Sequence, residues 1–105
     1  MKMNIARDGA KLTVTIQGRI DTVTTMEIEK KLKETSLDGI RLTVMDFAGV
    51  EYITSMGLRM VLAFYNRMHE HGALKIIHVN DDVLQVFDIT GFIDLLDIEP
   101  DDEAE

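Results

Sequence analysis

Hydrophobic and polar residues alternate near the start of the chain and recur with helical spacing farther along it. Leu12, Val14 and Ile16 alternate with threonine and glutamine, which is the two-residue period of a half-buried strand. An Asp-Gly turn signal at 8–9 separates this stretch from residues 3–6. We therefore expect an N-terminal β-hairpin, followed by helices and strands in alternation.

The predicted elements after the hairpin are three helices, each followed by a short apolar strand. The full order is strands over 3–6 and 11–17, a helix over 22–35, a strand over 41–47, a helix over 56–71, a strand over 74–79, a helix over 82–89 and a strand over 95–98. Asn80 is expected to cap the last helix, and Gly91 is expected to end it. This order predicts an α/β fold with a mixed, mostly parallel sheet and helices packed on it.

A serine stands where the strand over 41–47 must give way to the helix that begins near Leu58. As an N-cap, the Ser55 hydroxyl would accept a hydrogen bond from a first-turn amide, an arrangement worth about 1 kcal/mol against alanine. The same position lies at the positive end of the helix dipole, which favours a phosphate on the hydroxyl. Ser55 is thus either a simple cap or a site of phosphorylation.

The helix that follows Ser55 is apolar on two sides. At 100° per residue one side carries Leu58, Val61, Leu62 and Tyr65, and the other carries Met56, Met60, Ala63 and Arg67. A helix laid on a sheet needs one buried stripe. We therefore expect Met56 and Met60 either to be covered by a neighbouring element or to contact a partner.

Composition and charge exclude several classes of function. A chain of 105 residues with 46% hydrophobic content supports one domain without a metal or disulfide staple, and it contains no cysteine for thiol catalysis. The net charge of −8 opposes binding to nucleic acid. The three histidines do not have the spacing of a metal site, and no sequence motif predicts a cofactor or a catalytic nucleophile.

The ends of the chain lead to two further expectations. The start carries no charged-then-apolar leader and the apolar runs are too short to span a bilayer, so we expect a cytoplasmic protein without direct membrane insertion. We assign residues 1–99 to the domain. Residues 100–105 are expected to form a disordered acidic tail.

Four segments resemble a known family. The run D-F-A-G-V-E-Y-I-T-S-M-G-L at 46–58 is similar to the STAS-domain signature D-L-S-x-V-x-F-[IM]-D-S-[ST]-G-L, in particular that of bacterial anti-sigma factor antagonists. G-R-I-D at 18–21, G-A-L-K-I at 72–76 and V-F-D-I-T-G-F at 86–92 resemble other family segments. Together they cover nearly the whole chain in the family's order, and the resemblance implies the STAS fold.

The resemblance also implies roles for individual residues. Ser55 matches the phosphorylated serine, whereas Thr54 and Met56 replace the usual aspartate and hydroxyl residue beside it. Thr54 is an alternative phosphate acceptor that ranks below Ser55. Asp21 matches an aspartate near the phosphoserine, although it is also a plausible cap for the helix after it.

The expected function is partner switching by a regulator that is not an enzyme. Without phosphate the protein would bind an anti-sigma factor that is a serine kinase, and phosphorylation would release it until a serine phosphatase restores Ser55. We expect the partner to contact Asp21, Thr54, Ser55, Met56, Gly57, Arg59 and Met60. An unphosphorylated STAS scaffold subunit of a transporter or sensory complex is the alternative, and a small enzyme or ligand carrier is the third possibility.

Overall fold

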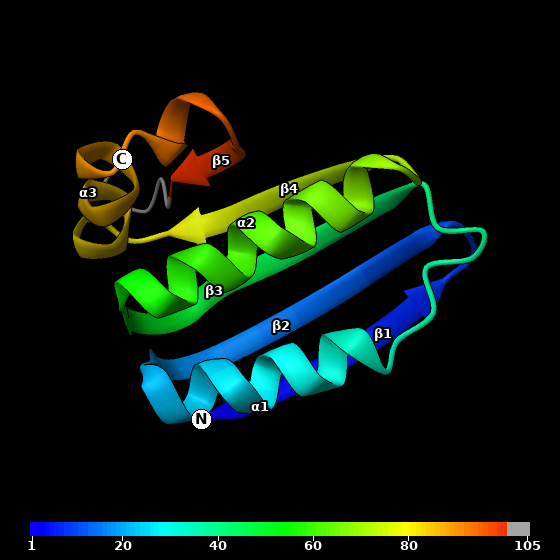
Figure 1. Ribbon diagram of the computed structural model, residues 1–105, viewed down its shortest axis with the longest axis horizontal. Helices are drawn as coiled ribbons and strands as arrows, with labels where there is room; N and C mark the ends of the chain where they lie inside the picture. The colour runs from blue at the N-terminus through cyan, green and yellow to red at the C-terminus, as the bar shows by residue number, and fades with distance from the viewer. Residues whose placement is uncertain (101–105) are drawn as a thin grey trace.

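The computed structural model describes residues 1–100 and contains the predicted hairpin followed by alternating helices and strands (Figure 1). The elements in chain order are β1 (Lys2–Asp8), β2 (Lys11–Ile20), α1 (Thr22–Lys33), β3 (Leu42–Ile53), α2 (Ser55–His69), β4 (Ala73–Val79), α3 (Asp81–Ile89), the 3₁₀ turn η1 (Phe92–Asp94) and β5 (Asp97–Pro100). Asn80 caps α3 by accepting a hydrogen bond from Val83 N at 2.8 Å, as predicted.

The five strands form one mixed sheet in the order β1-β2-β3-β4-β5. β1 is antiparallel to β2, and the remaining neighbours are parallel. The helices α1 and α2 lie side by side over one face of this sheet, and α3 lies beyond the carboxyl end of β4 (Figure 1). The predicted α/β class, with its hairpin and mostly parallel sheet, is confirmed.

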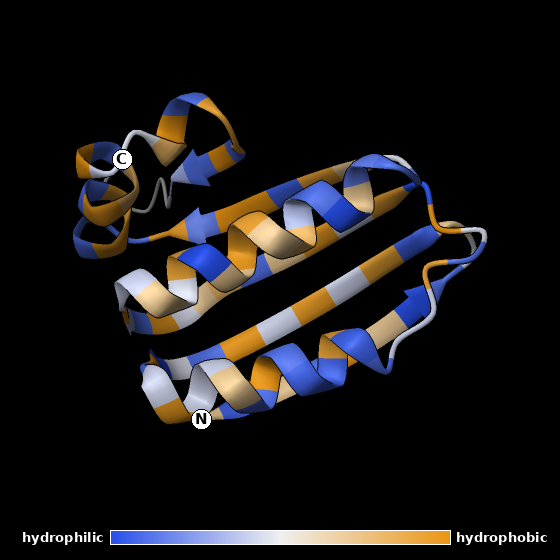
Figure 2. Cartoon of the chain, in the orientation of Figure 1, coloured by the Kyte–Doolittle hydropathy of each residue, from blue (hydrophilic) through white to orange (hydrophobic). Residues whose placement is uncertain are grey.

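The hydrophobic core lies between the sheet and the pair formed by α1 and α2. The alternation along β2, visible as bands in Figure 2, turns its apolar side chains toward the helices and leaves its threonines on the other face. The core side chains include Leu12, Val14, Ile16, Met45, Phe47 and Ile76 from the strands and Ile28, Leu32, Leu58, Val61, Phe64 and Met68 from the helices.

The strand β3 continues six residues beyond its predicted end at 47. The Ala-Gly pair at 48–49 does not end the strand but belongs to an irregularity in the pairing with β2. Asp46 supports this irregularity because its Oδ1 accepts a hydrogen bond from Ala48 N at 2.9 Å. A Cβ on Gly49 would lie 2.6 Å from the Cγ of Gln17, so the glycine permits close approach of the two strands.

The last strand begins two residues later than predicted because η1 occupies 92–94. Pro100, which the sequence assigned to the acidic tail, ends β5 and pairs with Val79. The ion pair between Lys75 and Glu99 also joins β4 to β5. The expected disorder of the rest of the tail falls on residues 101–105, which lie outside the described residues.

Candidate functional site

The first turns of α1 and α2 lie next to each other at one edge of the sheet. Ile20 and Ile53, the last residues of the parallel strands β2 and β3, pair in register. The amide of Thr54 donates a hydrogen bond to the carbonyl oxygen of Ile20 at 3.0 Å. Each helix begins two residues beyond this pair, so Asp21 and Ser55 belong to the same end of the molecule.

Asp21 caps α1. Its Oδ1 accepts a hydrogen bond from Thr24 N at 3.0 Å, and its own amide donates to Thr24 Oγ1 at 2.8 Å, which completes a capping box. The hydrogen bond from the Thr24 amide is the main cause that lowers the pKa of the Asp21 carboxyl below 3.8. The interpretation of Asp21 as a cap is confirmed, and its contact with a partner remains a prediction.

The prediction that Ser55 caps α2 is wrong, because Thr54 holds that position. Thr54 has extended backbone angles, φ −90° and ψ 170°, and its Oγ1 accepts a hydrogen bond from Gly57 N at 3.2 Å. Ser55 is the first residue of the helix, and its side chain is exposed. Within residues 1–100 its hydroxyl has no hydrogen-bond partner, so the group is chemically available.

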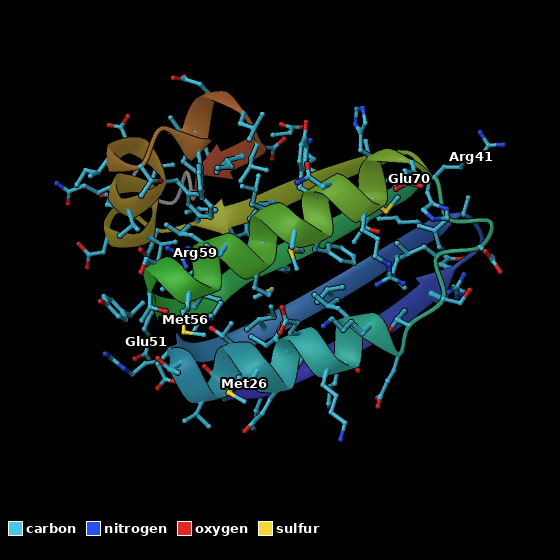
Figure 3. The ribbon with its side chains drawn as sticks, in the orientation of Figure 1. Met26, Arg41, Glu51, Met56, Arg59 and Glu70 are labelled. Atoms are coloured by element: carbon cyan, nitrogen blue, oxygen red, sulfur yellow. The ribbon has the colours of Figure 1, made fainter. Side chains whose placement is uncertain are left out.

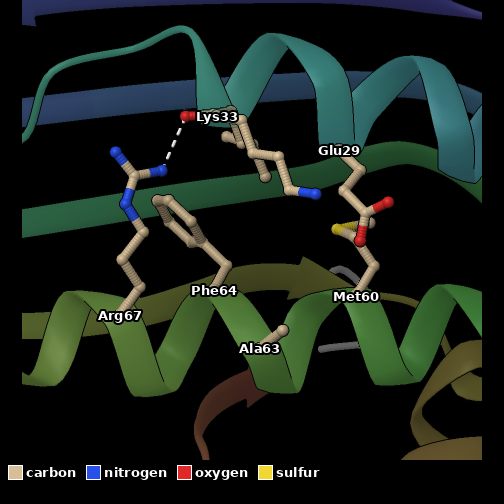
Figure 4. A pocket seen from close by; sticks show the side chains of 7 residues that line it. Glu29, Lys33, Met60, Ala63, Phe64 and Arg67 are labelled. Carbon is tan, nitrogen blue, oxygen red and sulfur yellow. Dashed lines mark hydrogen bonds between the residues drawn. The ribbon is translucent and has the colours of Figure 1, made fainter.

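Gly57 and Met60 are buried, and the expectation that a partner contacts them is wrong. A Cβ on Gly57 would lie 2.8 Å from side-chain carbons of both Ile20 and Ile53, so the glycine lets α2 approach the ends of β2 and β3. Met60 is 3% exposed and lies between α2 and α1 (Figure 4). The second apolar side of α2 is therefore explained largely by the neighbouring helix.

Met56 and Arg59 remain accessible near the start of α2. Met56 is 42% exposed and lies on the side of α2 turned toward α1 (Figure 3). Arg59 is exposed on the other side of the helix (Figure 3). Of the predicted contact residues, Asp21, Thr54, Ser55, Met56 and Arg59 thus lie where a partner could reach them.

Sequence reasoning missed three exposed apolar side chains at this same end. Val23 and Met26 in the first half of α1 are 65% and 62% exposed, and Tyr52 near the end of β3 is 42% exposed. The Arg19 guanidinium lies over the Tyr52 ring at 4.7 Å. Val23, Met26 and Met56, near the starts of α1 and α2, form what we term the helix-start surface, whereas Tyr52 alternates with the helix-facing Ile53 and points to the other face of the sheet. Val23 and Met26 could have been noticed because they fall outside the buried stripe of α1 at Thr25, Ile28 and Leu32.

A small pocket lies between α1 and α2, farther from the sheet edge. Its volume is about 100 Å³, and its lining consists of Glu29, Leu32, Lys33, Met60, Ala63, Phe64 and Arg67 (Figure 4). Small-molecule sites usually enclose roughly 300–1,000 Å³, so this pocket gives no support to a ligand carrier. Arg67 closes one end by donating hydrogen bonds of 2.7 Å to the carbonyl oxygens of Leu32 and Thr35.

The part of the chain that the structure describes holds neither a metal-binding cluster nor a membrane-spanning helix. No group of three or more histidine, aspartate or glutamate side chains is arranged to hold a metal ion there. None of the helices over residues 1–100 is both long enough and apolar enough to cross a membrane.

Two curated relatives of this chain carry names that describe regulators of sigma factors. BtrV of Bordetella bronchiseptica, named as an anti-sigma factor antagonist, is 28% identical over 105 residues, which cover 99% of this chain and 90% of BtrV. The anti-sigma-B factor antagonist of Staphylococcus aureus is 29% identical over 93 residues, which cover 88% of this chain and 86% of that protein.

Solved structures of the same fold include an anti-sigma factor antagonist from Mycobacterium paratuberculosis. Its TM-score is 0.84 at 20% identity, over 94% of this chain and 85% of that one. The structure of the anti-sigma factor antagonist SpoIIAA in its unphosphorylated form has a TM-score of 0.79 at 15% sequence identity. The match covers 98% of this chain and 92% of that one. The structure of SpoIIAA in its phosphorylated form has a TM-score of 0.71 at 14% sequence identity, and the match covers 98% of this chain and 96% of that one. A model of the STAS domain family matches residues 2–104, and the chain therefore belongs to the STAS domain family.

Proposed function

We propose that this protein is an anti-sigma factor antagonist that acts by partner switching at Ser55. The observation that supports the proposal best is the exposed Ser55 hydroxyl, which has no hydrogen-bond partner within residues 1–100 and stands at the first position of α2, next in sequence to the exposed Met56. The family and the names of the relatives point in the same direction. The partner would be an anti-sigma factor with serine kinase activity.

The chemistry on this chain is a phosphoryl transfer in which it serves as substrate. The Ser55 Oγ forms a bond to the γ-phosphorus of ATP as the bond to ADP breaks, and the hydroxyl proton is lost. The kinase supplies ATP, Mg²⁺ and the catalytic groups. A phosphatase uses water to return the hydroxyl and release inorganic phosphate. The protein itself is a regulator and not an enzyme.

The helix-start surface explains why phosphate would end the interaction. Covering exposed apolar side chains such as Met26 and Met56 with a partner removes them from water, which favours binding. A phosphate on Ser55 adds a charge of about −1.5 to −2, which must be desolvated in the same interface. A coupling of about 1–3 kcal/mol changes affinity roughly 5–150-fold, which is sufficient to redirect a shared partner.

Thr54 is a poorer phosphate acceptor than Ser55. Its side-chain oxygen holds the amide of Gly57 at 3.2 Å and is half-buried, so phosphorylation there would disrupt the cap of α2. Within residues 1–100 the Ser55 hydroxyl makes no hydrogen bond that phosphorylation would break. The geometry therefore supports the ranking of the two hydroxyls that the family resemblance implied.

The test is recovery of the tagged protein from its own cells during growth and stress. Mass spectrometry should find phosphate on Ser55, and the phosphorylated fraction should vary inversely with capture of an anti-sigma kinase. Ser55→Ala should capture that kinase under both conditions. Stoichiometric capture of another partner by a protein whose Ser55 is never modified would contradict the proposal and support a STAS scaffold subunit instead.

A further inference from the structure

Ser55 and Arg59 lie on the same face of α2. They are four residues apart, which places them roughly 40° apart about the helix axis. Their Cβ atoms are then about 5–6 Å apart, as for any pair at this spacing. Long side chains in a helix lean toward its N-terminus, so the Arg59 guanidinium is directed over the turn that begins with Ser55.

Nothing else in residues 1–100 engages the Arg59 side chain, which forms no hydrogen bond or ion pair there. Two other arginines differ in this respect. Arg67 is bonded to the end of α1, and Arg19 lies over Tyr52. The first turn of α2 contains no acidic residue that could compete for a cation. Glu51, which lies at the same end in Figure 3, makes no ion pair with Arg59.

We infer that Arg59 binds the phosphate of phosphorylated Ser55 within the same helix. A guanidinium presents a planar fork of donors that matches two phosphate oxygens, and both side chains are exposed and free to adjust. The inference rests on the proposed function for the presence of the phosphate. It assigns a role to Arg59, whose side chain makes no hydrogen bond or ion pair within residues 1–100.

One modification therefore changes two features of the exposed side chains around the first turn of α2. Without phosphate, Arg59 offers a cation to a carboxylate of the partner. With phosphate, the guanidinium is occupied inside the protein, and a net negative charge stands where the cation was accessible. The partner loses an attractive contact in addition to meeting the new charge.

The experiment uses the full chain with phosphoserine installed at position 55 during translation. The titration of the phosphate is followed by phosphorus NMR in otherwise wild-type protein, in Arg59→Gln and in Arg41→Gln. Arg41 is the matched control because it lies at the opposite end of the molecule (Figure 3). We expect the phosphate pKa in Arg59→Gln to exceed that in the wild type by roughly 0.3 or more, and Arg41→Gln to match the wild type.

Equal pKa values in the wild type and Arg59→Gln would overturn the inference, and so would an equal rise in Arg41→Gln. Circular dichroism verifies the fold of each variant. The guanidinium NMR signal of Arg59, compared with and without phosphate in the wild-type background, tests the same contact without a substitution. An unmoved signal would also overturn it. Since the phosphate is installed without a kinase, these results do not depend on whether cells phosphorylate Ser55.

Discussion

Thr54 and Ser55 are adjacent hydroxyl residues with different roles in the structure. Thr54 closes the open end of α2, whereas Ser55 presents a hydroxyl without a partner among the described residues. The sequence did not separate the two because both residue types are good N-caps, and the choice depends on where β3 ends. Once β3 is seen to continue through Ile53, the next residue is the cap.

Substitution of each hydroxyl residue in turn tests these roles. Thr54→Ala should lower the free energy of unfolding by about 1 kcal/mol, because the amide of Gly57 loses its side-chain acceptor. Ser55→Ala should change it by less than about 0.5 kcal/mol, as expected for an exposed side chain that makes no hydrogen bond within residues 1–100. Urea denaturation of both variants measures the difference, and the reverse order would show that Ser55 is the cap.

Asp21 makes the stability of α1 depend on pH. The Thr24 amide lowers the pKa of its carboxyl in the folded protein below the ordinary value of 3.8. The ionised carboxylate therefore stabilises the fold above pH 3.8, and this contribution is lost as the pH falls through the lower folded value. Asp21→Asn retains a capping oxygen but cannot ionise.

The expected result is that the wild type loses more stability on acidification than Asp21→Asn does. Urea denaturation at neutral pH and at several values below 3.8 measures both proteins under matched conditions. The other carboxylates are common to both and cancel in the difference. If the two stability curves stay parallel throughout this range, the ionised carboxylate of Asp21 does not support the helix.

At the scale of elements, Met56 and Met60 of α2 show how a neighbouring helix determines which apolar side chains are buried. Met56 and Met60 fall on the same side of the helix in the sequence pattern, and only the position of α1 separates their environments. Met60 is covered by α1, whereas Met56 lies at the exposed start of α2. Helical periodicity finds apolar sides, but it does not show which of them another helix covers.

Glutamate at each of these positions should give opposite results. Met60→Glu should destabilise the protein by about 2–4 kcal/mol or unfold it, because a charge would be placed between α1 and α2. Met56→Glu should keep the fold and weaken capture of the kinase. Circular dichroism, urea denaturation and the capture assay distinguish the two variants. Retention of full stability by Met60→Glu would show that the methionine is not part of the core.

The sequence predicted elements well where one signal dominated. The alternation at Leu12, Val14 and Ile16 identified β2, and the cap at Asn80 identified the start of α3. The prediction failed where strand pairing continues through an irregularity at Gly49, beyond the predicted strand end at 47. The exposed apolar side chains of α1 were not predicted, because the helical pattern identifies the buried stripe and says nothing of apolar residues outside it, such as Val23.

At the scale of the whole molecule, the parallel topology gathers the site at one end. Because β2 and β3 end in register, the helices that follow them begin together and leave the side chains of Val23 and Met56 in their first turns exposed. The protein carries 19 acidic and 11 basic residues, and this end holds both signs of charge, Arg19 and Arg59 together with Asp21 and Glu51.

The hydrogen bonds of Arg67 have a consequence for the dynamics of the site. They attach the last turn of α1 to α2, while the pairing of β2 with β3 fixes the first turns of both helices. The two helices are held at both ends, so docking requires little loss of backbone entropy. Amide hydrogen exchange across α1 should therefore be nearly the same with and without phosphate. The switch would be sensed as charge at a rigid surface and not as a change of shape.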